Sequence, residues 1–204
     1  MTPSGRLRAA VLLACLLVLV LLAAQVLLHG PVLAIDRAAT TFLVAHRQPG
    51  LTELMRLVSE LHETVKLLAV TALLMAWRSW RHDRSSTWAL LAVPAAMLLN
   101  LGLKHLVQRA RPVLDAPLVH LATFSFPSGH AVGASVFYGI VCALAWRHVH
   151  SRALRLLALL AALAMVLLVA FSRVYLGAHY LSDVLAGIAV GAACATLFVG
   201  WTRR

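Results

Sequence analysis

The chain has 204 residues, of which 62% are hydrophobic, and its mean hydropathy is strongly positive. This composition excludes an ordinary soluble globular protein and indicates an integral membrane protein. The formal net charge is +11, but the basic residues are not gathered on one amphipathic surface, so we expect no nucleic-acid partner.

Six apolar segments are candidate membrane helices, because a helix needs about 20 apolar residues to cross the hydrocarbon core. In chain order they are Ala9–Leu28, Val65–Trp77 with the residues that lead into it, Trp88–Leu106, Ala131–Trp146, Leu154–Phe171 and Leu181–Trp201. A signal peptide is the alternative for the first, but its apolar run exceeds the about 7–15 residues of such peptides. We therefore predict one all-α domain over residues 1–204, a bundle of six transmembrane helices.

Residues 29–62, between the first two predicted spans, mix charges with apolar side chains. The later part of this segment has helical periodicity. The sequence Gln48-Pro49-Gly50 is typical of a break between helices. We predict one or two short interfacial helices at the outer membrane surface, where they would cover a site or guide a lipid.

The distribution of charge predicts the orientation in the membrane. With a cytoplasmic N-terminus, the inside segments carry ten arginines and one acid, Asp83. The arginines are Arg6, Arg8, Arg78, Arg81, Arg84, Arg147, Arg152, Arg155, Arg203 and Arg204. Because basic residues favour the cytoplasmic side, both termini are predicted to be cytoplasmic, with the loops around 29–62, 107–130 and 172–180 facing outward.

Three polar patches fall on that outer side. They are "KHLVQRARP" at 104–112, "PSGH" at 127–130 and "SRVYLGAHYLSD" at 172–183. A single basic residue near a helix end is usually an anchor that reaches the headgroups. Three polar patches on the same side instead favour a common site at the outer ends of the third to sixth helices.

The first two patches suit a phosphate group. Lys104 and Arg111 are seven residues apart, so both point to one face if the helix continues between them, and together they can clamp an anion. Pro127 and Ser128 can open the fourth helix with Ser128 as its N-cap. Gly129 then lets an oxyanion approach the free amides and positive dipole of the first turn.

The histidines of the second and third patches supply reactive groups. His130 is placed to exchange a proton with a group bound at the helix start. His179 and Asp183 are four apart, hence neighbours on one helical face, where the carboxylate can orient one ring nitrogen and leave the other as a nucleophile. Arg173 adds a third cation. Because the cations would repel a divalent metal, we predict no metal and no cofactor.

The three patches match the motifs K-x6-R-P, P-S-G-H and S-R-x5-H-x3-D at every fixed position, so the chain resembles the type 2 phosphatidic acid phosphatase (PAP2) superfamily. The motifs cover residues 104–183, and the six-span outline extends the likeness over nearly the whole chain. The short length and the sequence "RARPVLDAPLVH" look most like compact bacterial members similar to phosphatidylglycerophosphate phosphatase B and undecaprenyl diphosphate phosphatase.

This resemblance implies a role for each matched residue. His179 would be the nucleophile that forms a phosphohistidine, Asp183 its orienting carboxylate, and His130 the group that protonates the leaving oxygen. The phosphoryl oxygens would be held by Lys104, Arg111, Ser128, Gly129 and Arg173. The implied substrates are phosphatidic acid, phosphatidylglycerol phosphate and polyprenyl diphosphates such as undecaprenyl diphosphate. The implied location is a bacterial plasma membrane, with the site facing the periplasm or exterior.

Two other functions use the same cationic pocket. A phosphate-lipid binding or transport protein would need the cations but not an oriented nucleophile. A soluble vanadium-dependent haloperoxidase is excluded by the apolar spans.

Several other polar residues have no part in the predicted chemistry or only an auxiliary one. His62 and Glu63 form an interfacial pair or contact a headgroup, and Asn100 makes a hydrogen bond between helices. Asp115 and His120 tune selectivity from the outer loop. His105 and Arg109, at variable positions of the first motif, receive no role. Cys15, Cys142 and Cys194 are small buried apolar residues.

Overall fold

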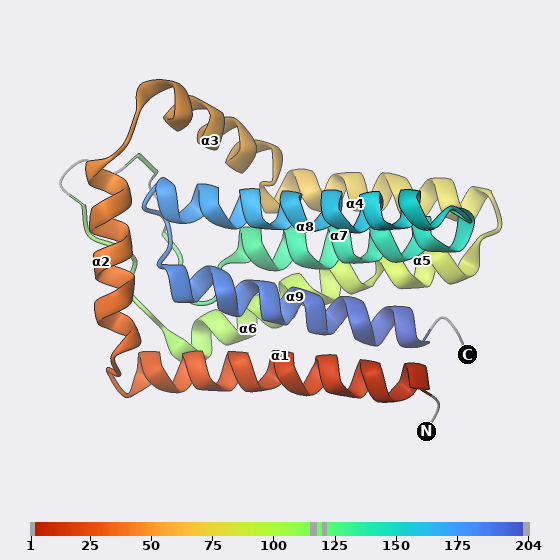
Figure 1. Cartoon of the computed structure of the whole chain (residues 1–204), viewed down its shortest axis with the longest axis horizontal. Coiled ribbons are helices and arrows are strands. Elements are labelled where there is room, and N and C mark those ends of the chain that lie inside the picture. Colours follow the sequence, from red (N-terminus) through yellow and green to blue (C-terminus); the bar gives the residue numbers. More distant parts are fainter. Residues whose placement is uncertain (1–2, 115–117, 120–121, 202–204) are drawn as a thin grey trace.

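The computed structural model describes residues 3–114, 118–119 and 122–201. Within these residues the chain forms nine α-helices and no β-strand (Figure 1), which confirms the predicted all-α class. The helices are α1 (Pro3–Leu27), α2 (Val32–Ala45), α3 (Pro49–Leu61), α4 (Thr64–Trp80), α5 (Arg84–Leu90), α6 (Ala92–Val107), α7 (Gly129–His148), α8 (Arg152–Tyr175) and α9 (Leu181–Trp201).

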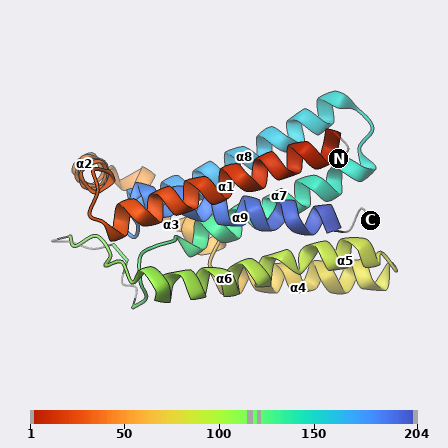
Figure 2. The ribbon, with the colours of Figure 1, turned by 90° about the horizontal axis from the view of Figure 1, so that it is seen from below.

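Helix α7 lies inside the bundle and packs against α4, α5, α6, α8 and α9 (Figures 1 and 2). Its contact with α9 is close because two glycines of α9, four residues apart, leave no room for a side chain between the two backbones. A Cβ added at Gly187 would lie 2.7 Å from the carbonyl oxygen of Ser128, and one at Gly191 would lie 2.5 Å from that of Val132. Glycines at this spacing let two apolar helices approach closely. The start of α9 is therefore held directly against the start of α7.

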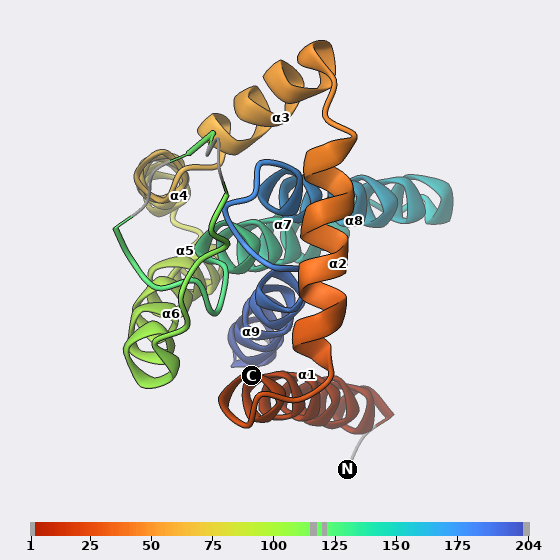
Figure 3. The ribbon, with the colours of Figure 1, turned by 90° about the vertical axis from the view of Figure 1, so that its left-hand side faces the viewer.

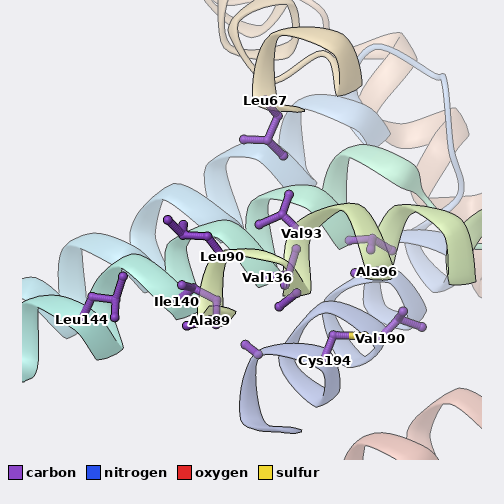
Figure 4. Close-up of a cluster of buried hydrophobic side chains, with 13 residues drawn as sticks. Leu67, Ala89, Leu90, Val93, Ala96, Val136, Ile140, Leu144, Val190 and Cys194 are labelled. Atoms are coloured by element: carbon purple, nitrogen blue, oxygen red, sulfur yellow. The ribbon is translucent and has the colours of Figure 1, made fainter. Parts of the chain in front are cut away.

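The main apolar core joins α4, α5, α6, α7 and α9 (Figure 4). Val93 of α6, Val136 and Ile140 of α7 and Val190 of α9 are all 2% exposed or less. Burying such side chains contributes about 1.5–3 kcal/mol each in water, although membrane-facing parts of the bundle gain mainly from packing. This core fixes the relative positions of the helices whose ends carry the three motifs.

Five helical stretches in the described part of the chain are long and apolar enough to cross a membrane. They are Gly5–Leu27, Arg84–Val107, Gly129–His148, Arg152–Tyr175 and Leu181–Val199. The remaining predicted span corresponds to α4, whose 17 residues rise about 26 Å, somewhat less than the about 30 Å of a hydrocarbon core. The structure is that of a multi-span membrane bundle, and the sixth span stays a prediction.

The predicted third span is interrupted rather than continuous. It comprises α5 and α6, which meet at Leu91. Pro94, in the first turn of α6, has no N–H to bond to the carbonyl of Leu90, so the helical ladder is broken at this point. The sequence did not lead us to expect this break.

The segment 29–62 folds as two short helices, as predicted. Helix α2 ends at Ala45, and α3 begins at Pro49, which occupies the first helical position where a proline is favoured. Helix α2 runs across one end of the long helices, as Figure 3 shows from that end. The two short helices therefore border the end of the bundle on which the motifs lie.

The polar motifs all lie at the end of the bundle that α2 crosses, where α6 ends, α7 begins and α8 connects to α9. The start of α1 and the end of α9 lie at the opposite end (Figure 1). The motifs and the two chain termini are thus on opposite sides of the bundle, in agreement with the predicted arrangement of the loops.

Candidate active site

Residues of all three motifs line one cavity of about 510 Å³ at this end of the bundle. Lys104 comes from the last turn of α6, Arg111 from the segment that follows, Gly129 and His130 from the first turn of α7, and His179 from the connection between α8 and α9. The fold therefore brings together residues that are up to 75 positions apart in the sequence.

Lys104 and Arg111 converge, but not along one helix as predicted. Helix α6 ends at Val107, because Gln108 adopts a left-handed conformation (φ 50°) and caps the helix by donating its N–H to the carbonyl of Lys104. The two cations meet instead at a carbonyl oxygen of the following segment. The Nζ of Lys104 donates to the oxygen of Phe124 at 2.5 Å, and Nη2 of Arg111 donates to the same oxygen at 3.2 Å.

Arg111 is fixed by backbone oxygens from two segments. Its Nε donates to the carbonyl of Thr123 at 2.7 Å, and its Nη1 donates to the carbonyl of Ala178 at 2.7 Å. Burial lowers the pKa of the Arg111 guanidinium, while Asp183 acts in the opposite direction. Because a guanidinium titrates far above neutral pH, Arg111 remains charged. It is therefore a positioned cation beside His179.

Ser128 occupies the predicted N-cap position of α7, but its side chain makes no capping hydrogen bond. Its Oγ atom has no hydrogen-bond partner in the described part of the chain, although the residue is 0% exposed. Its backbone N–H donates to the carbonyl oxygen of Asp183 at 3.0 Å, which links the starts of α7 and α9. Its hydroxyl remains available to a group bound at the helix start.

Three further buried atoms of the candidate site share this property. Within the described residues, His130 Nε2, Arg173 Nε and Asn100 Oδ1 have no hydrogen-bond partner. Buried polar atoms in folded proteins are nearly always hydrogen-bonded, because leaving one unpaired costs about 1–3 kcal/mol. Four such atoms in the candidate site, two of them on residues that line the cavity, indicate a place for a polar ligand. Asn100 thus lines this cavity, and its Oδ1 accepts no hydrogen bond from another helix in the described part of the chain.

His179 is oriented by the backbone. Its Nδ1 lies 2.8 Å from the carbonyl oxygen of Ser125. A carbonyl only accepts, so Nδ1 carries the proton and Nε2 bears the lone pair, which faces Nη1 of Arg111 at 3.2 Å. Burial lowers the pKa of His179 to about 4, against the opposing effect of Asp183. The imidazole is therefore neutral at pH 7, with its free nitrogen directed at the cations.

Asp183 faces His179, although the two do not share a helix as predicted. His179 lies in the turn before α9, and the Oδ2 atom of Asp183 is 3.6 Å from its Nδ1. The same Oδ2 accepts hydrogen bonds from the backbone N–H of Tyr180, at 2.8 Å, and from the hydroxyl of Ser125. Ser125 was not among the residues predicted from the sequence, and it contacts both His179 and Asp183.

Arg173 does not line the cavity of about 510 Å³. It is 2% exposed, and its Nη1 donates to the hydroxyl of Ser59. His130, Arg173 and Ser59 line a second, more polar cavity of about 330 Å³, together with Glu60 and Glu63. Since His130 lines both cavities, the two lie next to each other at this residue.

Arg109, which received no role from the sequence, lies behind Asp183 in the structure. Its guanidinium forms ion pairs with Asp183 at 2.6 Å and with Asp36 of α2 at 2.7 Å. A signal for this contact was present: Asp36 is an acid within the largely apolar segment "VLAIDRAATTFLVA", and an acid buried among apolar side chains needs a partner. The sequence alone does not say which cation that partner is.

His62 and Glu63 do not form the predicted interfacial pair. His62 is 7% exposed, and its ring bonds to the carbonyl of Val58 and to the hydroxyl of Tyr138, both at 2.7 Å. Glu63 instead pairs with Lys66 at 3.2 Å. The contact with Tyr138 of α7 thus holds His62 in place, and His62 lines neither of the two cavities.

Two further predictions concern the outer loop and metal binding. Asp115 and His120 lie outside the described residues. Among residues 3–114, 118–119 and 122–201, there is no group of three or more His, Cys, Asp or Glu side chains that could hold a metal ion. The three cysteines are unpaired, and Cys142 and Cys194 are buried.

Comparison with known sequences agrees with this geometry. Residues 85–204 match the family model of the PAP2 superfamily. The chain is 34% identical over 172 residues to phosphatidylglycerophosphatase B of Bacillus subtilis, covering 83% of this chain and 84% of the relative. It is 31% identical over 139 residues to the putative undecaprenyl-diphosphatase YbjG of Escherichia coli, covering 66% and 65%.

Solved structures share the arrangement of helices. The crystal structure of the transmembrane PAP2 type phosphatidylglycerolphosphate phosphatase from Bacillus subtilis superposes with a TM-score of 0.86 at 32% identity, covering 94% of this chain and 96% of the other. Aquifex aeolicus LpxE shares the fold with a TM-score of 0.63 at 20% identity, covering 81% and 95%. With these sequence matches and all three motifs gathered around one cavity, the chain belongs to the PAP2 superfamily.

Proposed function

We propose that the protein is an integral membrane lipid phosphatase that hydrolyses phosphomonoester or diphosphate headgroups through a phosphohistidine intermediate. One observation carries this proposal. The unprotonated Nε2 of His179 faces a cavity that has unpaired polar atoms and cations at one end and apolar walls along the rest. A phosphate at the polar end would satisfy those atoms, and the attached lipid would follow the apolar walls.

Binding of the phosphate uses cations and the start of α7. Lys104, Arg111 and Arg173 would neutralise the phosphoryl oxygens, as charge-assisted hydrogen bonds do at phosphate sites. The hydroxyl of Ser128 and the first free amides of α7, at Gly129, would complete the shell at the positive end of the helix dipole. The orphaned atoms on Ser128 and Arg173 support this assignment.

In the first step, Nε2 of His179 attacks the phosphorus atom and a P–N bond forms. The P–O bond to the lipid breaks, and His130 donates a proton to the departing oxygen. Arg111, which contacts Nε2 before substrate binds, would transfer its hydrogen bond to a phosphoryl oxygen. The positive charge that develops on the ring is stabilised by Asp183, which lies beside Nδ1.

In the second step, water attacks the phosphohistidine. His130 accepts a proton from the water, a P–O bond forms, the P–N bond breaks, and inorganic phosphate leaves. Nε2 regains its lone pair. The proton on Nδ1 stays in place throughout, held by the carbonyl of Ser125. Each step is a phosphoryl transfer in which the protein mainly positions groups and stabilises charge.

The apolar walls of the cavity suit a lipid chain. They are formed by Leu68 of α4 and by Pro94, Met97, Leu98 and Leu101 of α6. A chain seated there would lie between α4 and α6 with its phosphate beside His179. The names of the matched relatives suggest phosphatidylglycerol phosphate and undecaprenyl diphosphate as substrates, and phosphatidic acid is the third candidate from the sequence.

For the membrane arrangement, we propose one domain over residues 1–204 with α4 as a sixth span and both termini in the cytoplasm of a bacterial cell. The site would then face the periplasm or exterior, with α2 and α3 at the outer surface. The charge distribution supports this orientation, because ten of the eighteen Lys and Arg residues fall in the predicted inside segments.

The test is phosphate release by detergent-purified protein from undecaprenyl diphosphate, phosphatidylglycerol phosphate and phosphatidic acid in parallel. A chelator is present throughout, because the proposed chemistry needs no metal or other cofactor, and His179→Ala is the control. We expect turnover of at least one lipid that survives the chelator and is lost in the variant. No turnover with intact saturable binding would replace the phosphatase by a phosphate-lipid binding or transport protein.

A further inference from the structure

A buried network of four side chains joins α2 to the start of α9 behind the candidate active site. Asp36, Ser182 and Asp183 are 1% exposed or less, and the side chain of Arg109 is 8% exposed. None of the four lines the cavity of about 510 Å³ that holds the cations and His179. The four residues contact one another and lie outside the space where we place the phosphate.

Arg109 bridges two carboxylates from different parts of the chain. Its Nη1 donates to Oδ1 of Asp183 at 2.6 Å and to Oγ of Ser182 at 2.7 Å, and its Nη2 donates to Oδ2 of Asp36 at 2.7 Å. The guanidinium also stacks on the ring of Tyr180, 4.1 Å from its centroid. A planar guanidinium can hold two carboxylates in fixed directions, which the point charge of a lysine cannot do.

Asp36 reaches the same helix start independently of Arg109. Its Oδ1 accepts the backbone N–H of Ser182 at 2.9 Å, and its Oδ2 accepts the hydroxyl of Ser182 at 2.5 Å. An acid that receives the first amides of a helix stabilises that end. Here the acid comes from α2, so α2 fixes the first turn of α9, which carries Asp183.

The two oxygens of Asp183 then have separate partners. Oδ1 is held by Arg109, while Oδ2 faces Nδ1 of His179 at 3.6 Å and accepts the N–H of Tyr180. Without Arg109 the buried carboxylate would lose its cation, and Oδ2 would keep only the hydrogen bonds from Ser125 and Tyr180. The Arg109 contact therefore adds to these bonds in fixing the direction of Oδ2 toward His179.

We infer that Arg109 and Asp36 are positioning residues for the reaction, which act by holding Asp183 against His179. This inference rests on the proposed function of those two residues. It also gives α2 a role: the short helix that crosses the end of the bundle orients the group that stabilises the charged ring of the nucleophile. Arg109 and Asp36 touch neither the phosphate nor the lipid in this scheme.

The test compares Arg109→Lys and Asp36→Asn with wild type on whichever lipid phosphate the wild type hydrolyses. We expect kcat to fall about 10- to 100-fold, the usual loss when hydrogen-bond partners behind a reacting group are removed. KM should stay within about twofold, because the phosphate cations and the apolar walls are unchanged. Arg37→Gln is the matched control: it removes a charge from the neighbouring, exposed position of α2 and should leave both constants unchanged.

A double-mutant cycle separates positioning from a general loss of stability. In an Asp183→Asn background, Arg109→Lys should lower kcat by less than about threefold, because its route to His179 is already broken. If Asp36→Asn does not fold, Ser182→Ala serves instead, since it removes a hydroxyl that is bonded to Asp36 and Arg109 and removes no charge. Its kcat should fall several-fold.

The outcomes distinguish a failure of the proposed function from a failure of this inference. A wild-type protein that hydrolyses none of the lipid phosphates would overturn the proposed function and this inference with it. The inference alone would be overturned if the wild type is active but kcat stays within twofold of the wild-type value in Arg109→Lys and in the Asp36 or Ser182 variant. The inference would also be overturned if adding Arg109→Lys to Asp183→Asn lowered kcat by the same about 10- to 100-fold as in the wild-type background.

Discussion

The phosphate pocket and the Arg109 network lie on opposite sides of the Asp183 carboxylate, and their polar atoms are satisfied in opposite ways. In the network, Arg109, Asp36 and Ser182 all bond to one another. In the pocket, Ser128 Oγ and His130 Nε2 are buried without a partner among the described residues. Both regions are polar and buried, so burial alone does not identify a ligand site.

The difference separates two uses of buried polar groups. A fully bonded network in low dielectric fixes geometry, because each member would lose its partners on moving. An unpaired group costs stability and is retained where a ligand will pair with it. We therefore expect substitutions in the pocket to affect catalysis more than folding, and substitutions in the network to affect both.

The largest effect should come from His179→Ala in the pocket. Removing the nucleophile should lower turnover at least about 1,000-fold, as removal of a covalent nucleophile does in other hydrolases. The variant should still fold, because the bonds of Arg109 to Asp36 and Asp183 are intact. Phosphate release and thermal unfolding in detergent measure the two effects.

Substantial residual turnover by His179→Ala would remove His179 from the nucleophile role. If the variant did not fold, the contrast between the pocket and the network would be wrong, because a pocket residue would then be needed for folding as the network residues are.

The second prediction concerns stability as a function of pH. The folded-state pKa of His179, about 4, lies below the unfolded value of about 6.5. The unfolded chain therefore binds a proton first as the pH falls, and the contribution of His179 is complete above about pH 6.5 and lost between about 6.5 and 4. We expect about 3 kcal/mol of the free energy of unfolding to disappear over this window.

The control is again His179→Ala, whose unfolding midpoint in detergent should depend less on pH between 4 and 6.5. Equal slopes for the variant and the wild type would show that His179 is not held neutral by burial. The free nitrogen of His179 should also remain available for attack down to about pH 4, so an acid limb near pH 6.5 would have to come from another group.

Two serines give the third prediction, because one lies in each region. Ser128→Ala removes a hydroxyl with no partner, so the free energy of unfolding should change by less than about 0.5 kcal/mol. Losing one hydrogen bond to a charged phosphate should lower kcat/KM by about 10- to 100-fold. Ser182→Ala removes a hydroxyl bonded to Asp36 and Arg109 and should destabilise the protein by about 1.5–3 kcal/mol.

Thermal unfolding and steady-state kinetics of both variants, measured in the same detergent, check this contrast. Equal destabilisation by the two substitutions would mean that the hydroxyl of Ser128 has a structural partner.

The sequence predicted those features that depend on local pattern. Runs of apolar residues located the long helices, Pro49 located the start of α3, and Ser128 was placed at the N-cap of α7. The residues of the three motifs were also expected at one end of the bundle, and residues from each motif line a common cavity there. Each of these depends on residues close in the chain or on the sidedness of a membrane bundle.

What the sequence did not predict depends on backbone direction or on contacts between distant segments. Gln108 turns into the left-handed region, so Lys104 and Arg111 meet by way of a loop and not along a helix. Arg109 and Asp36 are 73 residues apart and meet because α2 folds across the end of the bundle. No local periodicity encodes that crossing, so Arg109 looked like a spacer residue within its motif.

The smallest effect should come from the apolar wall of the pocket, which binds the lipid without touching the phosphate. Leu101 of α6 lines the cavity and is 49% exposed, while Leu99 does not line it and is 48% exposed, which makes the two residues a matched pair. In Leu101→Trp the ring should displace one or two methylene groups of the bound chain, each worth about 0.8 kcal/mol, and raise KM for a long-chain lipid about 4- to 15-fold. A short water-soluble phosphate monoester should be hydrolysed with unchanged KM, and Leu99→Trp should change neither constant. If Leu101→Trp raised KM for both substrates equally, the wall would be part of the phosphate site itself. The division of the pocket into a polar end and a lipid-binding wall would then be wrong.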